Sequence, residues 1–381
     1  MALDSGPLVQ NALYLGGGAE WPLAPAEWEQ RAREALAPEA FDYVAGGAGS
    51  EATMRANLEA FERARLRPRM LAGTAERNLA VEILGLRSPV PFLLAPIGVL
   101  SIVHPEAELA VARAAAATGV PLVLSSAAST PLEDVAEIGP PRWYQLYWYS
   151  ERELAASFVQ RAECAGYGAI VLTVDTLTLG WRDRDLRRGY LPFLAGDGLA
   201  QLFSDPVFRA GLEAPPEEDR TTAAFQALLR FPNLGLTWDD LAWLREQTAL
   251  PLLVKGVLRG DDARLAVAHG AAGVVVSNHG GRQVDGAVAS LDALVEVRDA
   301  LGPEAIVLMD SGVRRGADVL KALALGADAV LLGRPYVYGL AAGGQAGVEA
   351  VVRQLAAELD VTCALAGVRT LADADRSLVA A

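Results

Sequence analysis

From Pro91 onward, short apolar runs alternate with alanine-rich segments that have helical spacing. The runs are rich in Val, Leu and Ile, which is typical of strands covered on both faces of a parallel sheet. They lie at 92–95, 121–124, 143–146, 169–173, 251–254, 272–276, 305–309 and 328–332. We expect helices near 105–118, 131–138, 151–165, 260–269, 290–301, 315–325 and 345–359. Right-handed crossovers repeated in this way close a sheet, so the pattern predicts an α/β fold, a (β/α)8 TIM barrel.

Two stretches depart from this pattern. Residues 1–90 predict an N-terminal helical segment with two or three irregular strands packing on a barrel of residues 91–381. We expect helices over 25–37 and 57–69, and a turn at 41–49 that carries Tyr43. Residues 177–238 follow the fourth strand and are dominated by Pro, Gly and charged residues. A long stretch without regular pattern inside a domain is commonly a lid or specificity insertion.

Composition narrows the class of protein. The chain has 381 residues, of which 52% are hydrophobic, and a formal net charge of −14. This acidity argues against nucleic acid or an anionic membrane surface as partner. Only Cys164 and Cys363 occur, and we expect Cys164 to be buried. The three histidines are widely spaced, so no metal site is predicted. No basic leader and no run of about 18 apolar residues is visible, so we expect a cytoplasmic protein without a membrane span.

One hexapeptide, SNHGGR at 277–282, carries the clearest chemistry. It follows the sixth apolar run, and it places His279 and Arg282 on a loop with two glycines. A neutral imidazole accepts a proton near pH 7, and a guanidinium holds a carboxylate with two parallel hydrogen bonds. The pair therefore indicates a base beside an anion clamp. The alternative is a polar loop with Asn278 as a helix cap.

In a barrel of this type, the chemistry lies at the carboxyl ends of the strands. The residues there are Pro96, Ile97, Gly98, Ser125, Gln145, Tyr147, Thr173, Asp175, Lys255, Ser277, Asp310, Ser311, Gly312, Arg314, Gly333 and Arg334. Barrels frequently bind phosphate after the last two strands, where this chain has glycines and two arginines. The alternative is that Gly312 and Gly333 only make tight turns.

Individual side chains suggest roles at this mouth. Lys255 is either a Schiff-base nucleophile or a fixed positive charge, which would stabilise an anionic reduced flavin. Gln145 and Thr173 suit hydrogen bonding to a flavin pyrimidine edge. Asp175 is expected to pair with His279 and raise the pKa of the charged imidazole. Arg182 is a second candidate anion clamp.

These motifs resemble one known family. SNHGGRQVDGA, LVKGV, TVDT, QLYWY, MDSGVRRGADVLKALALGA and GRPYVYGLA are similar to the FMN-dependent α-hydroxy-acid oxidases and dehydrogenases. The resemblance runs from about Ala35 to the C-terminus. It implies FMN as cofactor, a small 2-hydroxy acid as substrate and a homotetrameric assembly.

The resemblance also implies roles for matching residues. His279 matches the base and Asp175 its partner, while Arg182 and Arg282 match the arginines that hold the substrate carboxylate. Tyr43 and Tyr147 match tyrosines that touch the substrate. The residues that match flavin-contacting positions of the family are Pro96, Ile97, Gly98, Ser125, Gln145, Tyr147, Thr173, Lys255 and Ser277. The phosphate site matches Asp310, Ser311, Gly312, Arg314, Gly333 and Arg334.

Departures from the family pattern leave the electron acceptor open. Ala127 stands where plant-type oxidases carry a bulky aromatic residue, and Gly98 resembles the lactate 2-monooxygenase pattern. We expect oxidation of a lactate-, glycolate- or mandelate-like (S)-2-hydroxy acid, with O2 as acceptor. The alternatives are lactate 2-monooxygenase-type oxidative decarboxylation, a quinone-linked dehydrogenase, and a non-catalytic flavin-binding barrel.

Overall fold

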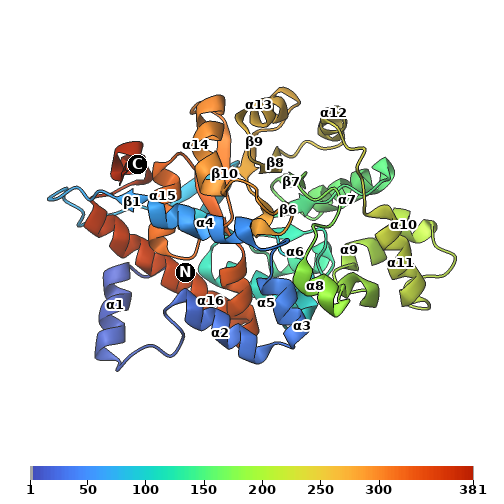
Figure 1. Cartoon of the computed structure of the whole chain (residues 1–381), viewed down its shortest axis with the longest axis horizontal. Helices are drawn as coiled ribbons and strands as arrows, with labels where there is room; N and C mark the ends of the chain where they lie inside the picture. The colour runs from blue at the N-terminus through green and yellow to red at the C-terminus, as the bar shows by residue number, and fades with distance from the viewer. Residues whose placement is uncertain (1–2, 381) are drawn as a thin grey trace.

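The computed structural model describes residues 3–380, and its centre is a closed barrel of eight parallel strands (Figure 1). The strands are β4 (Phe92–Leu94), β5 (Leu122–Ser125), β6 (Arg142–Leu146), β7 (Ile170–Thr173), β8 (Leu252–Val257), β9 (Gly273–Val276), β10 (Ile306–Met309) and β11 (Ala329–Leu332). They neighbour one another in chain order, and β11 pairs with β4 to close the ring. Each predicted strand overlaps an observed one, so the predicted barrel is confirmed.

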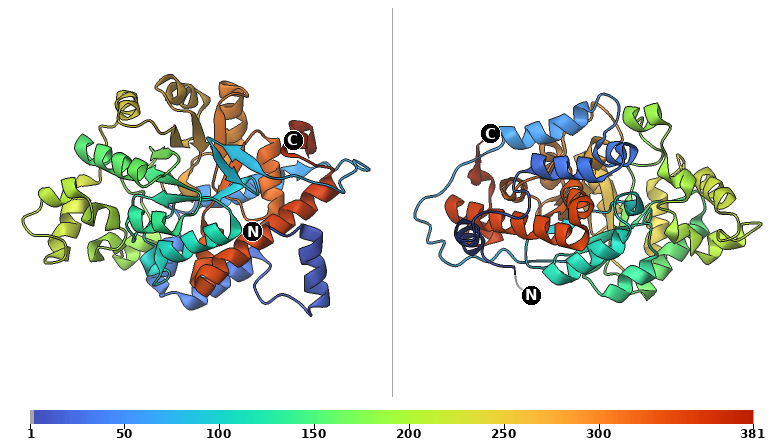
Figure 2. Two further views of the ribbon diagram at one scale, coloured as in Figure 1. Left: turned by 180° about the vertical axis from the view of Figure 1, so that it is seen from behind. Right: turned by 90° about the horizontal axis from the view of Figure 1, so that it is seen from below.

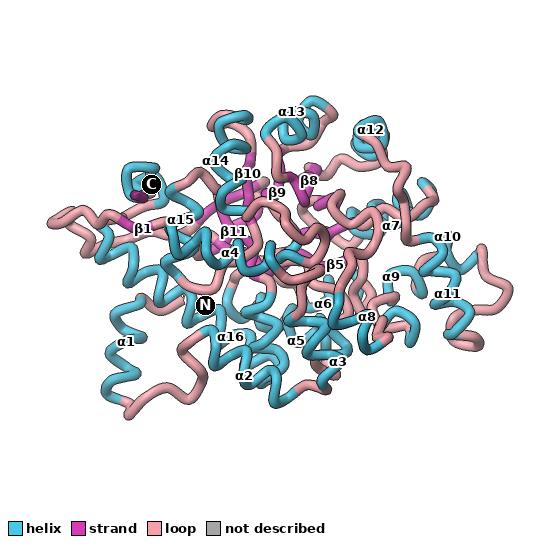
Figure 3. The backbone as a smooth tube through the Cα atoms, in the orientation of Figure 1, coloured by secondary structure: helices cyan, strands magenta, loops and turns pink. Residues whose placement is uncertain are grey.

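Helices surround the strands on the outside (Figure 3). They are α5 (Ala107–Thr118), α6 (Leu132–Ile138), α7 (Arg152–Cys164), α12 (Trp238–Glu246), α13 (Gly260–Ala268), α14 (Ser290–Leu301), α15 (Gly316–Ala324) and α16 (Arg334–Ala366). The last helix begins earlier than predicted, because Gly343 and Gly344 interrupt it with non-helical backbone and hide its first part from the sequence pattern. The prediction for Cys164 was wrong: it is exposed at the end of α7.

The barrel interior is filled by apolar side chains, with Trp143 as the largest. The antiparallel hairpin of β2 (Val81–Ile83) and β3 (Leu86–Ser88) contributes Ile83 to the same cluster. Only three residues join β3 to β4, so the hairpin covers the end of the barrel where the strands begin (Figure 2). The hairpin does not cover the opposite end of the barrel, where the strands finish.

The N-terminal segment forms helices α1 (Gly6–Leu15), α2 (Pro25–Ala35), α3 (Pro38–Ala45) and α4 (Ala52–Arg63). Strand β1 (Arg65–Leu66) then pairs with β12 (Val379–Ala380) at the other end of the chain. The predicted turn at Tyr43 was wrong, since Tyr43 lies inside α3. That helix has only eight residues and ends at Gly46, so its sequence resembles a turn. Helix α4 begins five residues before the predicted 57–69 segment.

The segment at 177–238 is more regular than predicted. It contains α8 (Asp183–Arg188), η2 (Pro192–Ala195), α9 (Ala200–Phe203), α10 (Pro206–Ala210) and α11 (Arg220–Arg230), at the right of Figure 1. Each helix is too short for a clear periodic pattern, and local caps such as Asp205, which accepts from the Val207 N–H at 2.9 Å, define their starts. The remaining short 3-10 turns are η1 (Leu100–Ile102), η3 (His279–Gly281), η4 (Leu371–Asp373) and η5 (Arg376–Leu378).

Two structural features are absent from residues 3–380. None of the helices there is long and apolar enough to cross a bilayer. Nor does any group of three or more His, Cys, Asp or Glu side chains within that range have a metal-binding arrangement.

Candidate active site

The top layer of the barrel interior is polar. Side chains alternate along a strand, so residues two positions beyond the apolar interior layer also point inward. That layer includes Val123, Trp143, Val171, Leu253, Val275 and Leu308. Two positions later come Ser125, Gln145, Thr173, Lys255, Ser277 and Asp310, all of which are buried. The carboxyl ends of the strands therefore present a floor of hydrogen-bonding groups, as the sequence predicted.

Lys255 is fixed in this floor by two neighbours. Its Nζ lies 3.1 Å from Asp310 Oδ2 and donates to Ser277 Oγ at 3.0 Å. Burial disfavours the ammonium, but the charges of Asp310 and Asp175 outweigh it, and the pKa of Lys255 is raised. A lysine that stays protonated is a poor Schiff-base nucleophile. The geometry thus favours the fixed positive charge over the nucleophile.

Two polar atoms of the floor have no partner among the described residues. Gln145 Nε2 and Thr173 Oγ1 are buried without a hydrogen bond, while Gln145 Oε1 accepts from Ser125 Oγ at 2.9 Å. A buried unpaired donor costs about 1–3 kcal/mol, so such atoms are expected to face a ligand. An amide N–H and a hydroxyl on the paired strands β6 and β7 match the alternating carbonyl and N–H groups of a flavin pyrimidine edge. The residues present therefore fit FMN.

The loops after β10 and β11 form the other end of the same cavity. Ser311, Gly312, Arg314, Gly333 and Arg334 line it together. Gly312 has φ +94°, and a Cβ there would lie 2.8 Å from the backbone oxygen of Asn57, so only glycine fits. Gly312 therefore does more than make a tight turn, because its lack of a side chain lets this loop approach the backbone of Asn57 closely.

Arg334 makes contacts that the sequence did not indicate. Its guanidinium donates to the backbone oxygens of Val44 at 3.1 Å, Gly280 at 3.0 Å and Gly46 at 2.7 Å. It thereby joins the end of α3 to the η3 loop. The guanidinium of Arg314, in contrast, donates only to the backbone oxygen of Val313, at 2.9 Å, among the described residues.

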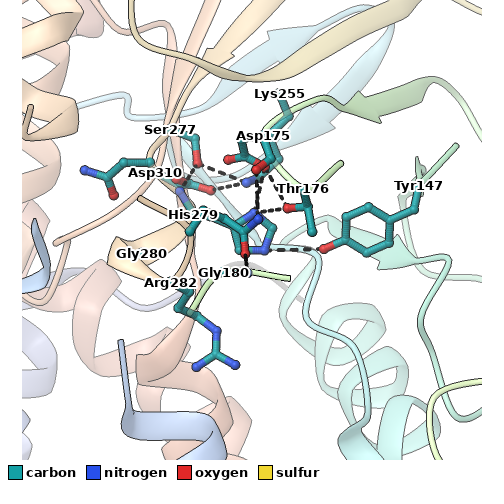
Figure 4. Close-up of polar contacts among 12 residues, drawn as sticks. Tyr147, Asp175, Thr176, Gly180, Lys255, Ser277, His279, Gly280, Arg282 and Asp310 are labelled. Carbon is teal, nitrogen blue, oxygen red and sulfur yellow. Dashed lines mark hydrogen bonds and ion pairs between the residues drawn. The ribbon is translucent and has the colours of Figure 1, made fainter. Parts of the chain in front are cut away.

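Beyond the floor, His279 lies between a carboxylate and a phenol (Figure 4). Its Nδ1 is 2.9 Å from Asp175 Oδ1, and its Nε2 is 3.3 Å from the hydroxyl of Tyr147. Thr176 Oγ1 donates to the same Asp175 oxygen at 2.9 Å. An ionised carboxylate only accepts hydrogen bonds, so the proton of the neutral imidazole is assigned to Nδ1. The bare Nε2 therefore faces the cavity.

The electrostatics keep the imidazole neutral at rest. Burial lowers the pKa of His279, Asp175 opposes this, and the charge of Lys255 adds to the lowering. The net direction is down, so the predicted rise was wrong, because burial and Lys255 together outweigh the aspartate. Burial alone would raise the pKa of Asp175, but His279 and Lys255 hold it below its usual range. A neutral base backed by an ionised carboxylate is the result.

Two arginines lie across the cavity from this base. The guanidiniums of Arg282 and Arg182 lie 5.0 and 5.9 Å from the ring centre of Tyr43. Arg282 Nη1 donates to the backbone oxygens of Tyr43 at 2.5 Å and Gly46 at 2.9 Å. Burial and the neighbouring charge of Arg182 lower the pKa of Arg282. The closest carboxylate, Asp185, is 4.0 Å from Arg182. Two adjacent cations with so little compensation form a site for an anion.

The remaining wall of the cavity is apolar. It is lined by Ala127, Tyr149, Phe193, Leu199, Leu228 and Phe231. Phe231 follows α11 and packs edge-on against Tyr147, with ring centres 5.9 Å apart. The insertion after the fourth barrel strand thus supplies part of the wall.

Several residues at the site were missed from the sequence. Gln283 accepts from Arg182 at 3.2 Å, and Thr176 contacts both His279 and Asp175. Both are adjacent to predicted residues, which was the available signal. Asn57 lies in the predicted 57–69 helix and Phe231 in the predicted 177–238 insertion, but neither was predicted as a site residue, and only the fold brings them here.

Comparison with known proteins gives consistent matches. The sequence profile of the FMN-dependent dehydrogenase family matches residues 32–381. L-lactate oxidase from Nostoc sp. is 47% identical over 365 residues, which cover 94% of this chain and 98% of that protein. Glycolate oxidase from Spinacia oleracea is 43% identical, covering 93% and 95%. A crystal structure of mandelate oxidase superposes with a TM-score of 0.84 at 40% identity, covering 94% of this chain and 98% of the other.

Proposed function

Because the chain belongs to the FMN-dependent dehydrogenase family, we propose that it oxidises an (S)-2-hydroxy acid to the 2-oxo acid with FMN as cofactor. The observation that carries the proposal is the placement of His279, backed by Asp175, opposite the Arg182 and Arg282 pair in one cavity. This arrangement suits an anionic substrate with an ionisable proton near its carboxylate.

Each side chain has a specific task in this proposal. Arg282 and Arg182 hold the substrate carboxylate, and Tyr43 adds a hydrogen bond. His279 Nε2 accepts a proton from the substrate, and Asp175 stabilises the imidazolium that forms. Tyr147, whose hydroxyl lies 3.3 Å from Nε2, orients the substrate hydroxyl. When bound, FMN supplies a two-electron acceptor for the substrate Cα. Isotope effects on flavin reduction distinguish removal of the hydroxyl proton by His279 from removal of the Cα proton.

We assign FMN to the polar floor and the adjoining loops. Pro96, Ile97 and Gly98 would lie beside the ring, and Ser125, Gln145, Thr173, Lys255 and Ser277 would contact it. Asp310, Ser311, Gly312, Arg314, Gly333 and Arg334 would surround the phosphate end. Gln145 Nε2 and Thr173 Oγ1, which lack partners among residues 3–380, support this assignment. Lys255 would stabilise negative charge on the reduced ring.

We further propose O2 as the electron acceptor, with hydrogen peroxide as its product. The names of the relatives, L-lactate oxidase and glycolate oxidase, support an oxidase. Oxidative decarboxylation of the monooxygenase type is the alternative, and it is supported by the resemblance of Gly98 to the lactate 2-monooxygenase pattern. A Cβ at Gly98 would lie 2.8 Å from the Cβ of Ala127. Peroxide yield and product analysis in air distinguish the two, and a quinone-linked enzyme would give little peroxide.

The apolar wall supports an acid whose side chain is uncharged, such as lactate or mandelate. This wall includes the small Ala127 and the aromatic Phe231, and none of the described residues that form it carries an ionised group for a polar substituent. We also propose a homotetrameric, cytoplasmic enzyme. It would comprise an N-terminal segment over 1–90 and the FMN-binding barrel over 91–381, with 177–238 as lid. The exposed Leu8, Tyr14 and Leu15 of α1 support an assembly of several chains.

The test is substitution of the base. His279→Gln is expected to leave a yellow, FMN-loaded protein in which flavin reduction by lactate or mandelate falls by about 10²–10⁴-fold, the scale of a lost general base. Stopped-flow absorbance under anaerobic conditions measures it. Near-normal reduction in the variant would refute the assignment of His279.

A further inference from the structure

The η3 loop that carries His279 has an unusual backbone. Three successive residues, His279, Gly280 and Gly281, have φ of +58°, +66° and +74°. This left-handed region suits glycine but is unfavourable for a histidine, so surrounding contacts must hold the loop in place. Asn278, immediately before the histidine, makes several of these contacts.

Every donor and acceptor of the buried Asn278 side chain has a partner. Its Oδ1 accepts from the Gly281 N–H at 3.1 Å, across the turn that contains His279. Its Nδ2 donates to the backbone oxygen of Val288 at 3.1 Å. The remaining donor and acceptor both meet Asn57, a residue of α4 that is only 2% exposed.

The two asparagines form a reciprocal amide pair. Asn57 Nδ2 donates to Asn278 Oδ1 at 2.9 Å, and Asn278 Nδ2 donates to Asn57 Oδ1 at 2.7 Å. Asn57 Oδ1 also accepts from the Ser290 N–H at 3.1 Å. A buried pair in which each amide nitrogen and oxygen has a partner favours a single geometry, because displacement leaves a polar group unpaired.

Helix α4 is itself held against the barrel at both ends. Asp285 accepts from Ser50 and Thr53 N–H groups at 2.7 and 3.1 Å and so caps the start of the helix. Near its end, Lys321 Nζ donates to the backbone oxygen of Phe61 at 2.7 Å. In Figure 1, α4 crosses in front of the barrel beside α14 and α15. The helix is thus a rigid support for Asn57.

We infer that Asn57 is a positioning residue for the base: through Asn278 it holds the His279 loop in the left-handed conformation that directs Nε2 into the cavity. The inference rests on the proposed function, because it assigns a catalytic task to the geometry of His279. Arg282 is held separately, by Tyr43 and Gly46 of the α3 end, and Gly281 O accepts from the Ala48 N–H at 2.8 Å. Loss of the amide pair is therefore expected to displace the base more than the anion clamp.

The experiment compares Asn57→Ala with the isosteric Asn57→Asp, which keeps the packing but places an acceptor against Asn278 Oδ1. Anaerobic flavin reduction by lactate and mandelate is followed by stopped flow and expressed per bound FMN. A displacement of about 1 Å costs up to about 100-fold in rate, so we expect the limiting rate constant to fall by about 10- to 100-fold in both variants. The substrate concentration at half-saturation and the FMN content should change less than about threefold.

The matched control is Lys321→Met, which removes another tie of α4 without touching the His279 loop. It should reduce its flavin at the wild-type rate. Wild-type rate constants in both Asn57 variants, or an equal loss in Lys321→Met, overturn the inference while leaving the proposed function intact. A wild-type flavin that none of these acids reduces would overturn both.

Discussion

Replacing Asp175 by asparagine tests the electrostatics of the base directly. The imidazolium that forms on His279 would lose an ionised partner 2.9 Å away, while asparagine can still accept the Nδ1 hydrogen bond. Two unit charges about 4 Å apart attract by about 4 kcal/mol at an effective dielectric constant of about 20. A charge-assisted hydrogen bond contributes about 1.5–3 kcal/mol net. The expected loss is therefore about 2–4 kcal/mol, or about 30- to 1000-fold in the rate of flavin reduction.

The pH dependence of this variant gives a second, independent readout. The base must be neutral to act, so activity falls as pH drops through its pKa. Burial lowers the pKa of His279 in the wild type, and Asp175 opposes that lowering, so the acidic limb should lie below the ordinary pH 6.5. Removal of Asp175 should move this acidic limb to a still lower pH. Stopped-flow reduction across a pH series measures both quantities.

Thr176→Val is the control, because it removes a hydroxyl that donates to the same carboxylate without changing a charge. We expect a smaller loss of about 2- to 10-fold, because the hydroxyl donates to the ionised Asp175 both before and after His279 becomes charged, and only the difference between the two states affects the rate. A variant Asp175→Asn that reduces its flavin at the wild-type rate would refute the reasoning. So would an acidic limb that moves to higher pH.

Two further substitutions test the anion clamp and the flavin floor. Arg282→Met should lower kcat/KM for a 2-hydroxy acid by about 10²–10³-fold, because the buried substrate carboxylate loses one of its two guanidinium partners. The same substitution should affect the corresponding amide much less, since an amide carries no charge. Steady-state kinetics with both compounds decide this, and equal losses would contradict an ionic role. Thr173→Val should weaken FMN binding by about tenfold yet leave the apoprotein equally or more stable, because the hydroxyl has no partner among the described residues. Flavin fluorescence titration and urea unfolding of the apoprotein measure the two effects, and a less stable apoprotein with unchanged FMN affinity would argue against it.

The barrel could be predicted because its strands are buried on both faces. Runs such as Gly273–Val276 are apolar without interruption, and their spacing repeats eight times. Helix α3 and the helices at 177–238 could not be predicted in the same way. They are short, and their starts depend on single caps such as Asp205 and on Pro38 at the first turn of α3.

The site was predictable where its residues follow barrel strands, and not elsewhere. Asp175 and His279 lie just after β7 and β9, and Lys255 lies near the end of β8, so position alone indicated a shared mouth. Asn57 meets Asn278 across 221 positions of the chain, and no local pattern reports such a contact. The lowered pKa of His279 depends on burial and on the charge of Lys255, which only the folded arrangement determines.

The cap of α4 has a consequence for synthesis of the chain. The helix begins at residue 52, but the carboxylate that completes its first turn is Asp285, 235 positions after Ser50. During translation, this helix must therefore wait, incompletely capped, until most of the barrel has left the ribosome. A nascent chain that stops short of Asp285 lacks this cap, and it also lacks the pocket residues Asp310, Gly312 and Arg334.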